Sequence, residues 1–268
     1  MTAPDTHRWI ALDDEHIPPR FWRMEGDVPQ GDMEDVTDPT AVQALTDRQP
    51  LFRFAPPQSV GKSVPFKPSD LGVQSAPGNV WHLEGLSQSR PLGQLRGSAC
   101  RIDGFLGLNP QWDGVLCLPT ATVTDWALVS AGEVVSFLSF ATVPLVSALS
   151  PVDPLISTAS PEAVTGSLPD VLSRPELLAA RVAQARAASV LLNLSPEEAL
   201  GQIWGAALGA ELAGSKPYWL GQPVTLIAPS YLAGPYKAAL ASQFVAFTET
   251  DEARITLEGF IRAYRRTQ

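Results

Sequence analysis

The C-terminal half of the sequence alternates helix and strand patterns, and this alternation constrains the fold more than any other feature. Ser195-Pro196-Glu197-Glu198 is a capping box with proline at the first helical position, which predicts a helix from there to Ala213. Gly214 follows as the residue that ends it. Around this helix we expect a helix at 176–192, a strand at 224–228, a helix at 232–242, a strand at 244–247 and a helix at 252–266. The succession predicts an α/β fold with at least part of its sheet parallel.

The N-terminal half carries mainly strand patterns. Apolar segments predict a strand at 9–12 with a hairpin partner at 20–24, buried strands at 80–83 and 115–118, and a hairpin of 127–129 with 134–140. About two turns of helix are expected at 40–47. Proline makes up 25 of 268 residues, and the prolines between 56 and 77 predict irregular chain with little regular sheet there.

Charge and composition exclude several classes of partner. The formal charge is −9, and the first fifty residues contribute −7 of it, from 11 acidic and 4 basic side chains. We therefore expect no binding of nucleic acid or of an anionic membrane. The most apolar run, 134–149, is interrupted by Pro144 and is shorter than the ~18 residues of a membrane span. No signal peptide is visible, which predicts a cytoplasmic protein with Cys100 and Cys117 reduced.

Short motifs suggest chemistry but lack the residues that it needs. Gly61-Lys62-Ser63 matches the end of a P-loop, but Pro56 stands where the first glycine belongs and no helix start follows. Gly205 and Gly209 predict close packing of their helix on the sheet. The acidic residues 13–15 follow a strand, and they are either magnesium-facing carboxylates or a solvated acidic turn. The three histidines predict no metal site, so these patterns alone define no catalytic constellation.

Several segments, in order, resemble the 2-keto-3-deoxygalactonate kinases (2-dehydro-3-deoxygalactonokinases) of the actin-like ATPase superfamily. They are GNVWHLEGL (78–86), LRGSACRIDGFLG (95–107), RAASVLLNLSPEEALGQIWGAALGAELA (186–213) and VTLIAPSYLAGPYKAAL (224–240). The resemblance implies two ribonuclease-H-like α/β domains of the actin-like ATPase/sugar kinase type: a reduced N-terminal domain at 1–110 and a C-terminal domain at 111–268. It also implies transfer of the γ-phosphoryl group of ATP, with magnesium, to a 2-keto-3-deoxy sugar acid.

The resemblance also transfers candidate site residues to matching positions. It implies nucleotide binding by Asp13, Thr120 and Ser230, and substrate binding by Arg96, Gly97 and Thr142. Asp13 and Asp125 are the candidates for catalysis.

Most of the family's phosphate-binding pattern is missing from this sequence. In its D-W-G-S-T-N-x-R segment Asp13 and Arg20 remain, but Glu15 introduces a negative charge where a phosphate belongs, and Pro18 removes an N–H donor. The paired glutamates of R-G-E-E-T are replaced by serine and alanine at 98 and 99. The loops P-G-T-H-x-K-W (119–126), T-G-E (142–144) and A-G-T-S-L-T (Pro229 for its glycine) are altered as well. We therefore predict a degenerate member of the family.

Three hypotheses about function follow. The first is a catalytically impaired homologue that binds a sugar acid or regulates, as a homodimer or paired with an active paralogue. The second is an active kinase with a rewired site, in which Asp13 orients magnesium and Asp125 or Asp103 acts as the base. The third is an α/β binding protein unrelated to the family.

Overall fold

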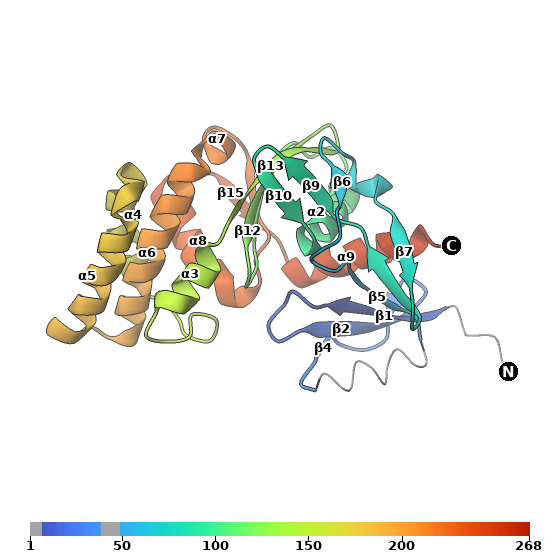
Figure 1. The fold of residues 1–268 in the computed structure, drawn as a ribbon, viewed down its shortest axis with the longest axis horizontal. Coiled ribbons are helices and arrows are strands. Elements are labelled where there is room, and N and C mark those ends of the chain that lie inside the picture. Colours follow the sequence, from blue (N-terminus) through green and yellow to red (C-terminus); the bar gives the residue numbers. More distant parts are fainter. Residues whose placement is uncertain (1–6, 39–48) are drawn as a thin grey trace. The chain divides into compact units, whose positions relative to one another are not determined.

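The structure is a computed structural model that describes residues 7–38 and 49–268, and the helix predicted at 40–47 lies outside them. The chain divides into two compact units. Unit 1 comprises residues 1–113, 129–137 and 251–268, and unit 2 comprises residues 114–128 and 138–250. Unit 1 thus takes in the C-terminal segment, whereas the domain boundary after residue 110 stays a prediction. Figure 1 labels the elements of both units.

The main sheet of unit 1 has the strand order β3-β2-β1-β5-β8-β7, with β4 paired to β2. Strand β1 is antiparallel to β2, which confirms the predicted hairpin, and it is parallel to β5, which is parallel to β8. The carboxyl ends of β1, β5 and β8 therefore meet at one edge, where α/β sheets commonly bind ligands. The bounds are β1 (Arg8–Asp13), β2 (Arg20–Glu25), β3 (Val28–Pro29), β4 (Glu34–Asp35), β5 (Leu51–Phe54), β7 (Val73–Ala76) and β8 (Val80–Leu83).

A second, three-stranded sheet in unit 1 has the order β10-β9-β6. Its strands are β6 (Lys62–Ser63), β9 (Leu86–Ser89) and β10 (Leu92–Leu95), and a short 3-10 helix η1 (Pro68–Asp70) follows β6. The expectation of little regular sheet in the proline-rich stretch was wrong for β7. The four residues of that strand pair with β8, because the prolines flank the strand and leave its backbone N–H groups free to bond.

Two helices, α2 (Gly97–Leu108) and α9 (Glu252–Arg265), pack together in unit 1. Their backbones approach closely, since a Cβ at Gly104 would lie 2.1 Å from the Ile255 carbonyl oxygen and one at Gly259 would lie 2.2 Å from that of Cys100. The sequence pattern predicts α9 but not α2, because the glycines that permit this contact also lower the helix propensity of the segment.

The sheet of unit 2 has the order β13-β12-β11-β14-β15. In each main sheet, the three strands that come first in the sequence lie side by side. Two later strands then extend the sheet, parallel to the earliest of the three. The bounds are β11 (Gly114–Pro119), β12 (Thr124–Ser130), β13 (Glu133–Phe140), β14 (Val224–Leu226) and β15 (Phe247–Glu249), with β12 and β13 continuing into segment 129–137. The strand predicted at 244–247 begins later, since Phe244 has φ +54°.

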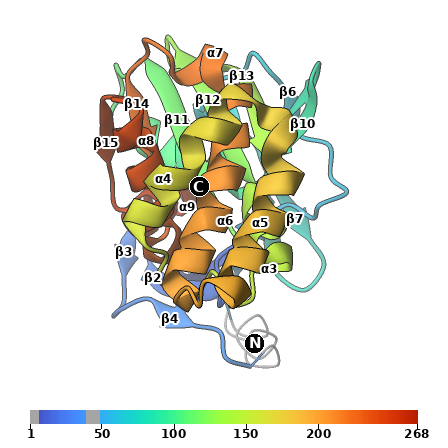
Figure 2. The same cartoon turned by 90° about the vertical axis from the view of Figure 1, so that its left-hand side faces the viewer.

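Helices cover the sheet of unit 2, and α4, α5 and α6 lie side by side (Figures 1 and 2). The capping box of α6 is confirmed: the Ser195 hydroxyl accepts from the Glu198 N–H, and the Glu198 carboxylate accepts from the Ser195 N–H. Gly205 and Gly209 do permit close packing, but their neighbour is α4, so the prediction of helix on sheet was wrong. The bounds are α3 (Thr142–Leu149), α4 (Pro161–Ser173), η2 (Pro175–Leu177), α5 (Leu178–Leu191), α6 (Pro196–Gly214), α7 (Lys216–Trp219) and α8 (Ser230–Ser242).

Within the described ranges, no helix combines the length and the apolar character needed to cross a bilayer. Cys100 and Cys117 are both buried and free.

Candidate functional site

Asp13 lies at the carboxyl end of β1 and is fully buried. Its carboxylate accepts from Arg20 Nε at 3.1 Å and Nη2 at 2.9 Å, and from Arg101 Nη2 at 3.1 Å. The backbone N–H groups of Glu15 and His16 add contacts of 3.2 Å each. Five nitrogen atoms therefore donate to a group with about four lone-pair sites. The Asp13 carboxylate has no acceptor capacity left for another ligand.

Glu252, at the start of α9, shares both of these arginines. Its carboxylate lies 2.6 Å from Arg20 Nη2 and 3.0 Å from Arg101 Nε, and it also accepts from the Thr256 hydroxyl at 2.8 Å. Burial alone would raise the pKa of Glu252, but the guanidinium groups of Arg101 and Arg20 outweigh burial and lower the pKa to about 2. The carboxylate is therefore charged throughout the physiological range, and it fixes α9 to β2 and α2.

The carboxylate of Glu15 lies at the N-terminus of α2. It accepts from the Gly97 N–H at 3.2 Å and lies 3.3 Å from Arg96 Nη1 and 3.2 Å from Arg101 Nη1. A helix N-terminus with two cations beside it is a favourable place for an anion, and here the protein supplies the anion itself. A Cβ at Gly97 would lie 2.2 Å from Glu15 Oε2, so a larger residue there would displace this carboxylate.

We call these six residues the arginine–carboxylate network: Asp13, Glu15, Arg20, Arg96, Arg101 and Glu252. Its three formal negative charges balance its three positive ones. Burial alone would lower the pKa of Arg101, but the carboxylates of Asp13, Glu252 and Glu15 outweigh burial and raise it well above its usual value. The network is a neutral set of ion pairs that contains the predicted site residues Asp13 and Arg96. A third predicted residue, Gly97, donates its N–H to Glu15 of the network.

Asp103, a candidate base, also has two arginine partners. Its buried carboxylate lies 2.8 Å from Arg262 Nε and 2.6 Å from Arg266 Nη1. Both arginines belong to the C-terminal segment, so Asp103 ties this segment to α2.

In unit 2, the predicted residues Thr142 and Asp125 lie near a buried acid that the sequence analysis missed. Glu211 on α6 accepts from Trp126 Nε1 at 2.9 Å and from the Tyr236 hydroxyl at 3.3 Å, and it is hydrogen-bonded to the Thr142 side chain. Burial raises the pKa of Glu211 to about 7. Asp125, itself buried, accepts from the Ser139 hydroxyl at 2.6 Å.

Thr120 and Ser230 follow the neighbouring parallel strands β11 and β14, so both lie at the carboxyl edge of the sheet. The Thr120 hydroxyl closes its own turn, since it donates to the Val123 carbonyl at 2.9 Å. Ser230 is the exposed first residue of α8 and lines a cavity of about 170 Å³. Both residues therefore lie at the edge where α/β sheets commonly bind ligands, and their role in nucleotide binding stays a prediction.

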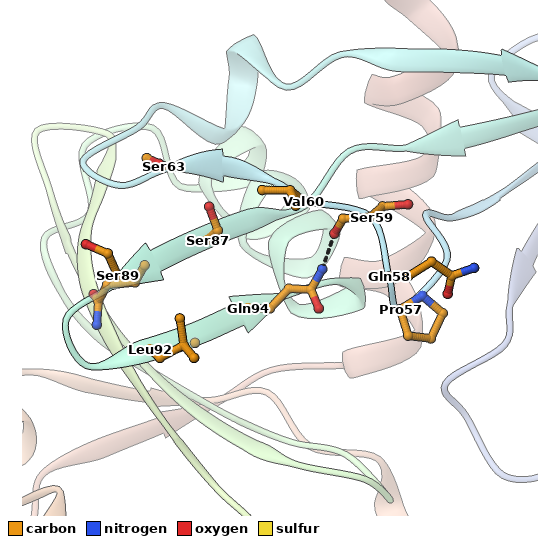
Figure 3. Close-up of a pocket in the computed structure, with 11 residues that line it drawn as sticks. Pro57, Gln58, Ser59, Val60, Ser63, Ser87, Ser89, Leu92 and Gln94 are labelled. Carbon is orange, nitrogen blue, oxygen red and sulfur yellow. Dashed lines mark hydrogen bonds between the residues drawn. The ribbon is translucent and has the colours of Figure 1, made fainter.

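Unit 1 also has an open groove of about 590 Å³ over one face of its small sheet (Figure 3). Ser63, Ser87 and Gln94 lie in one row across the three strands, and loop 57–60 borders the groove. A hydrogen bond from Gln94 to the Ser59 carbonyl ties this loop to β10. The residues that line the groove carry no charge, so a sugar acid would find no cation in it.

The residues that the sequence analysis missed are Arg101, Glu252 and Glu211. Glu211 is a charged residue among apolar neighbours in its helix, and Arg101 follows the apolar pair Ala99-Cys100, so burial of either side chain requires a partner. That pattern signals a buried polar contact but does not identify the partner. Glu252 stands among polar and charged neighbours at the start of α9, so its sequence gives no such signal. Among the described residues, no group of three or more His, Cys, Asp or Glu side chains is arranged to hold a metal ion.

Similar solved structures identify the fold. A structure from Sinorhizobium meliloti, described provisionally as a 2-dehydro-3-deoxygalactonokinase, matches with a TM-score of 0.79 and 19% identity over 97% of this chain and 98% of that chain. The 2-hydroxyisocaproyl-CoA dehydratase activator of Clostridium difficile, with bound ADPNP, matches with a TM-score of 0.58 and 8% identity over 96% and 94%. The fold is therefore that of the actin-like ATPases and sugar kinases, as predicted.

A third structure with this fold, component A of (R)-2-hydroxyglutaryl-CoA dehydratase from Acidaminococcus fermentans, has a TM-score of 0.59 and 7% identity over 97% of this chain and 98% of that chain. The family model for 2-keto-3-deoxy-galactonokinase matches residues 53–263, and the chain belongs to that family. The hypothesis of an unrelated α/β protein was therefore wrong. No curated protein sequence matches the chain.

The network makes a prediction about stability. Arg101→Met removes a cation that faces three carboxylates, so we expect the free energy of unfolding to fall by about 3–5 kcal/mol, the usual cost of breaking a buried ion pair. Arg8→Met removes an exposed ion pair with Glu25 and should change the free energy of unfolding by less than about 1 kcal/mol. Urea unfolding of both variants checks this, and equal changes would contradict it.

Glu211 makes a prediction about pH. The pKa of Glu211 is higher in the folded state than in the unfolded state, so the folded protein holds the proton more tightly. The free energy of unfolding should therefore fall as the pH rises from about 4.5 to about 7. The loss should be roughly 3 kcal/mol at most. In Glu211→Gln, which is neutral at every pH, this part of the pH dependence should disappear. The measurement is the free energy of unfolding at pH 5 and pH 8 in both proteins, and an identical pH dependence would refute the assignment.

Proposed function

We propose that this member of the 2-keto-3-deoxy-galactonokinase family binds a sugar acid but does not transfer phosphate to it at the site around Asp13. The observation that carries the proposal is the occupancy of the Asp13 carboxylate by Arg20 and Arg101. Family kinases use ATP with magnesium, so the first question is whether the residues present suit that pair.

The residues around Asp13 do not suit magnesium. A magnesium ion needs carboxylate or water oxygens with free lone pairs, and those of Asp13 accept from five nitrogen atoms. The flanking guanidinium groups of Arg20 and Arg101 would also repel a cation. The arginines neutralise the carboxylate that would otherwise attract the metal.

The residues at the N-terminus of α2 do not suit a phosphate either. The Glu15 carboxylate already accepts the Gly97 N–H and pairs with Arg96 and Arg101. A phosphate at that position would meet a like charge and would have to displace these bonds. The family's phosphate loop is thus replaced by an internal anion.

The candidates for a base that accepts the proton of the sugar hydroxyl are replaced or already paired. Positions 98 and 99, which are glutamates in the family pattern, are buried serine and alanine at the start of α2. Asp103 is paired with two arginines, and Asp125 is buried and bonded to Ser139. These contacts count against the alternative of an active kinase with a rewired site.

Arg96 is the residue that we assign to sugar-acid binding. Its side chain is 22% exposed, and it uses Nε for the Ala55 carbonyl and Nη1 for Glu15. A guanidinium has five N–H donors, so further donors remain for the carboxylate of a ligand. We propose a sensor or regulatory role in the cytoplasm, where the buried free cysteines would stay reduced, either as a homodimer or with an active paralogue.

Thermal shift and coupled ADP release test the proposal together. With 2-keto-3-deoxygalactonate we expect a rise in melting temperature, because a ligand at a hundred times its Kd adds about 2.7 kcal/mol of stability. ATP–magnesium should give no shift and no ADP release above background. Arg96→Gln should abolish the sugar-acid shift, and Arg90→Gln, an exposed arginine that serves as the matched control, should keep it. Turnover of ATP with the sugar acid would establish the rewired kinase instead.

A further inference from the structure

Unit 2 has a second cavity, of about 420 Å³, among its helices. Its walls come from α3, from η2 and the start of α5, and from the middle of α6. These helices pack on one another, and Figure 2 shows them side by side. The cavity is distinct from the arginine–carboxylate network, which lies in unit 1.

The lining is aliphatic apart from one carboxylate. Leu145, Val146, Leu149, Leu178, Ala179, Val182, Ile203 and Ala207 form the walls, and Glu176 is the charged residue among the lining residues. A cavity of this size with mostly apolar walls and few polar groups has the composition of a small-molecule site. The apolar walls favour burial of a hydrocarbon body, since hydrocarbon gains free energy on leaving water.

Glu176 determines the charge of the ligand that fits. It lies in η2, is exposed, and forms no ion pair with any residue in the described ranges. The nearby Arg181 is directed to Asp170 and Gln184 instead. The lining therefore offers one negative charge and no positive one, which disfavours fatty acids and favours an apolar molecule with a cationic head.

We propose that this cavity binds a hydrophobic ammonium compound, with its aliphatic body between α3, α5 and α6 and its charged nitrogen beside Glu176. Charge complementarity selects this occupant over a second copy of the chain. The exposed aliphatic side chains at the end of α5, Val190, Leu191 and Leu192, would fill the apolar space in a dimer but would leave Glu176 without a partner. The proposal does not depend on the function assigned to unit 1.

Three eight-carbon probes that differ only in the head group test it by isothermal titration calorimetry: n-octylamine, n-octanol and n-octanoate at pH 7. We expect octylamine to bind about 1.4- to fivefold more tightly than octanol, because an exposed ion pair contributes about 0.2–1 kcal/mol. Octanoate should bind more weakly than octanol. Glu176→Gln should equalise octylamine and octanol, whereas Glu197→Gln, an exposed glutamate outside the cavity, should not.

A second variant tests the location. Ala179 is exposed on α5 and lines the cavity, so Ala179→Phe should fill the space without disturbing the core and should abolish binding of all three probes. Octanoate binding as tightly as octylamine, or binding that survives Ala179→Phe, would overturn the proposal. A concentration-dependent dimer in sedimentation that Ala179→Phe abolishes and octylamine leaves intact would show that a second copy occupies the cavity, and would overturn the proposal.

Discussion

The buried pairing of Asp13 with Arg20 and Arg101 is the interaction on which the rest of unit 1 depends. Removing three carboxylates and their arginines from water is costly, and only a complete set of partners offsets that cost. Glu252 completes the set from α9, nearly the whole chain length away. The network therefore ties the C-terminal helix to the first strand, and the loss of any member leaves an uncompensated charge.

The same interaction connects the fold to the function. In the family pattern the edge of the first sheet is kept open for polyphosphate and metal, with small residues around the conserved aspartate. Here Glu15 supplies an anion at the start of α2, and Arg101 supplies a cation to Asp13. The charges of Asp13 and Arg101 are thus paired within the chain. The proposed function rests on this exchange, since a site whose charges are already paired has little affinity left for a charged ligand.

The sequence predicted much of the architecture, because local patterns carry it. The α6 capping box, the β1–β2 hairpin and the parallel strands of the C-terminal half leave direct signals in neighbouring residues. Helix α2 was missed, because its glycines serve a contact with α9 that is remote in sequence. The candidate site was predicted only in part: Glu15 was recognised as opposing phosphate, but its partner Arg101 and the role of Glu252 depend on tertiary contacts that no local pattern encodes.

Water-proton relaxation with manganese as the magnesium substitute tests the central claim most directly. When a manganese complex of a non-hydrolysable ATP analogue binds a protein, slower tumbling enhances the relaxation of water. With this chain we expect no enhancement beyond that of the manganese–nucleotide complex alone, because the Asp13 carboxylate is occupied. Enhancement that saturates at one manganese per chain with micromolar affinity, and that Asp13→Asn abolishes, would contradict the account.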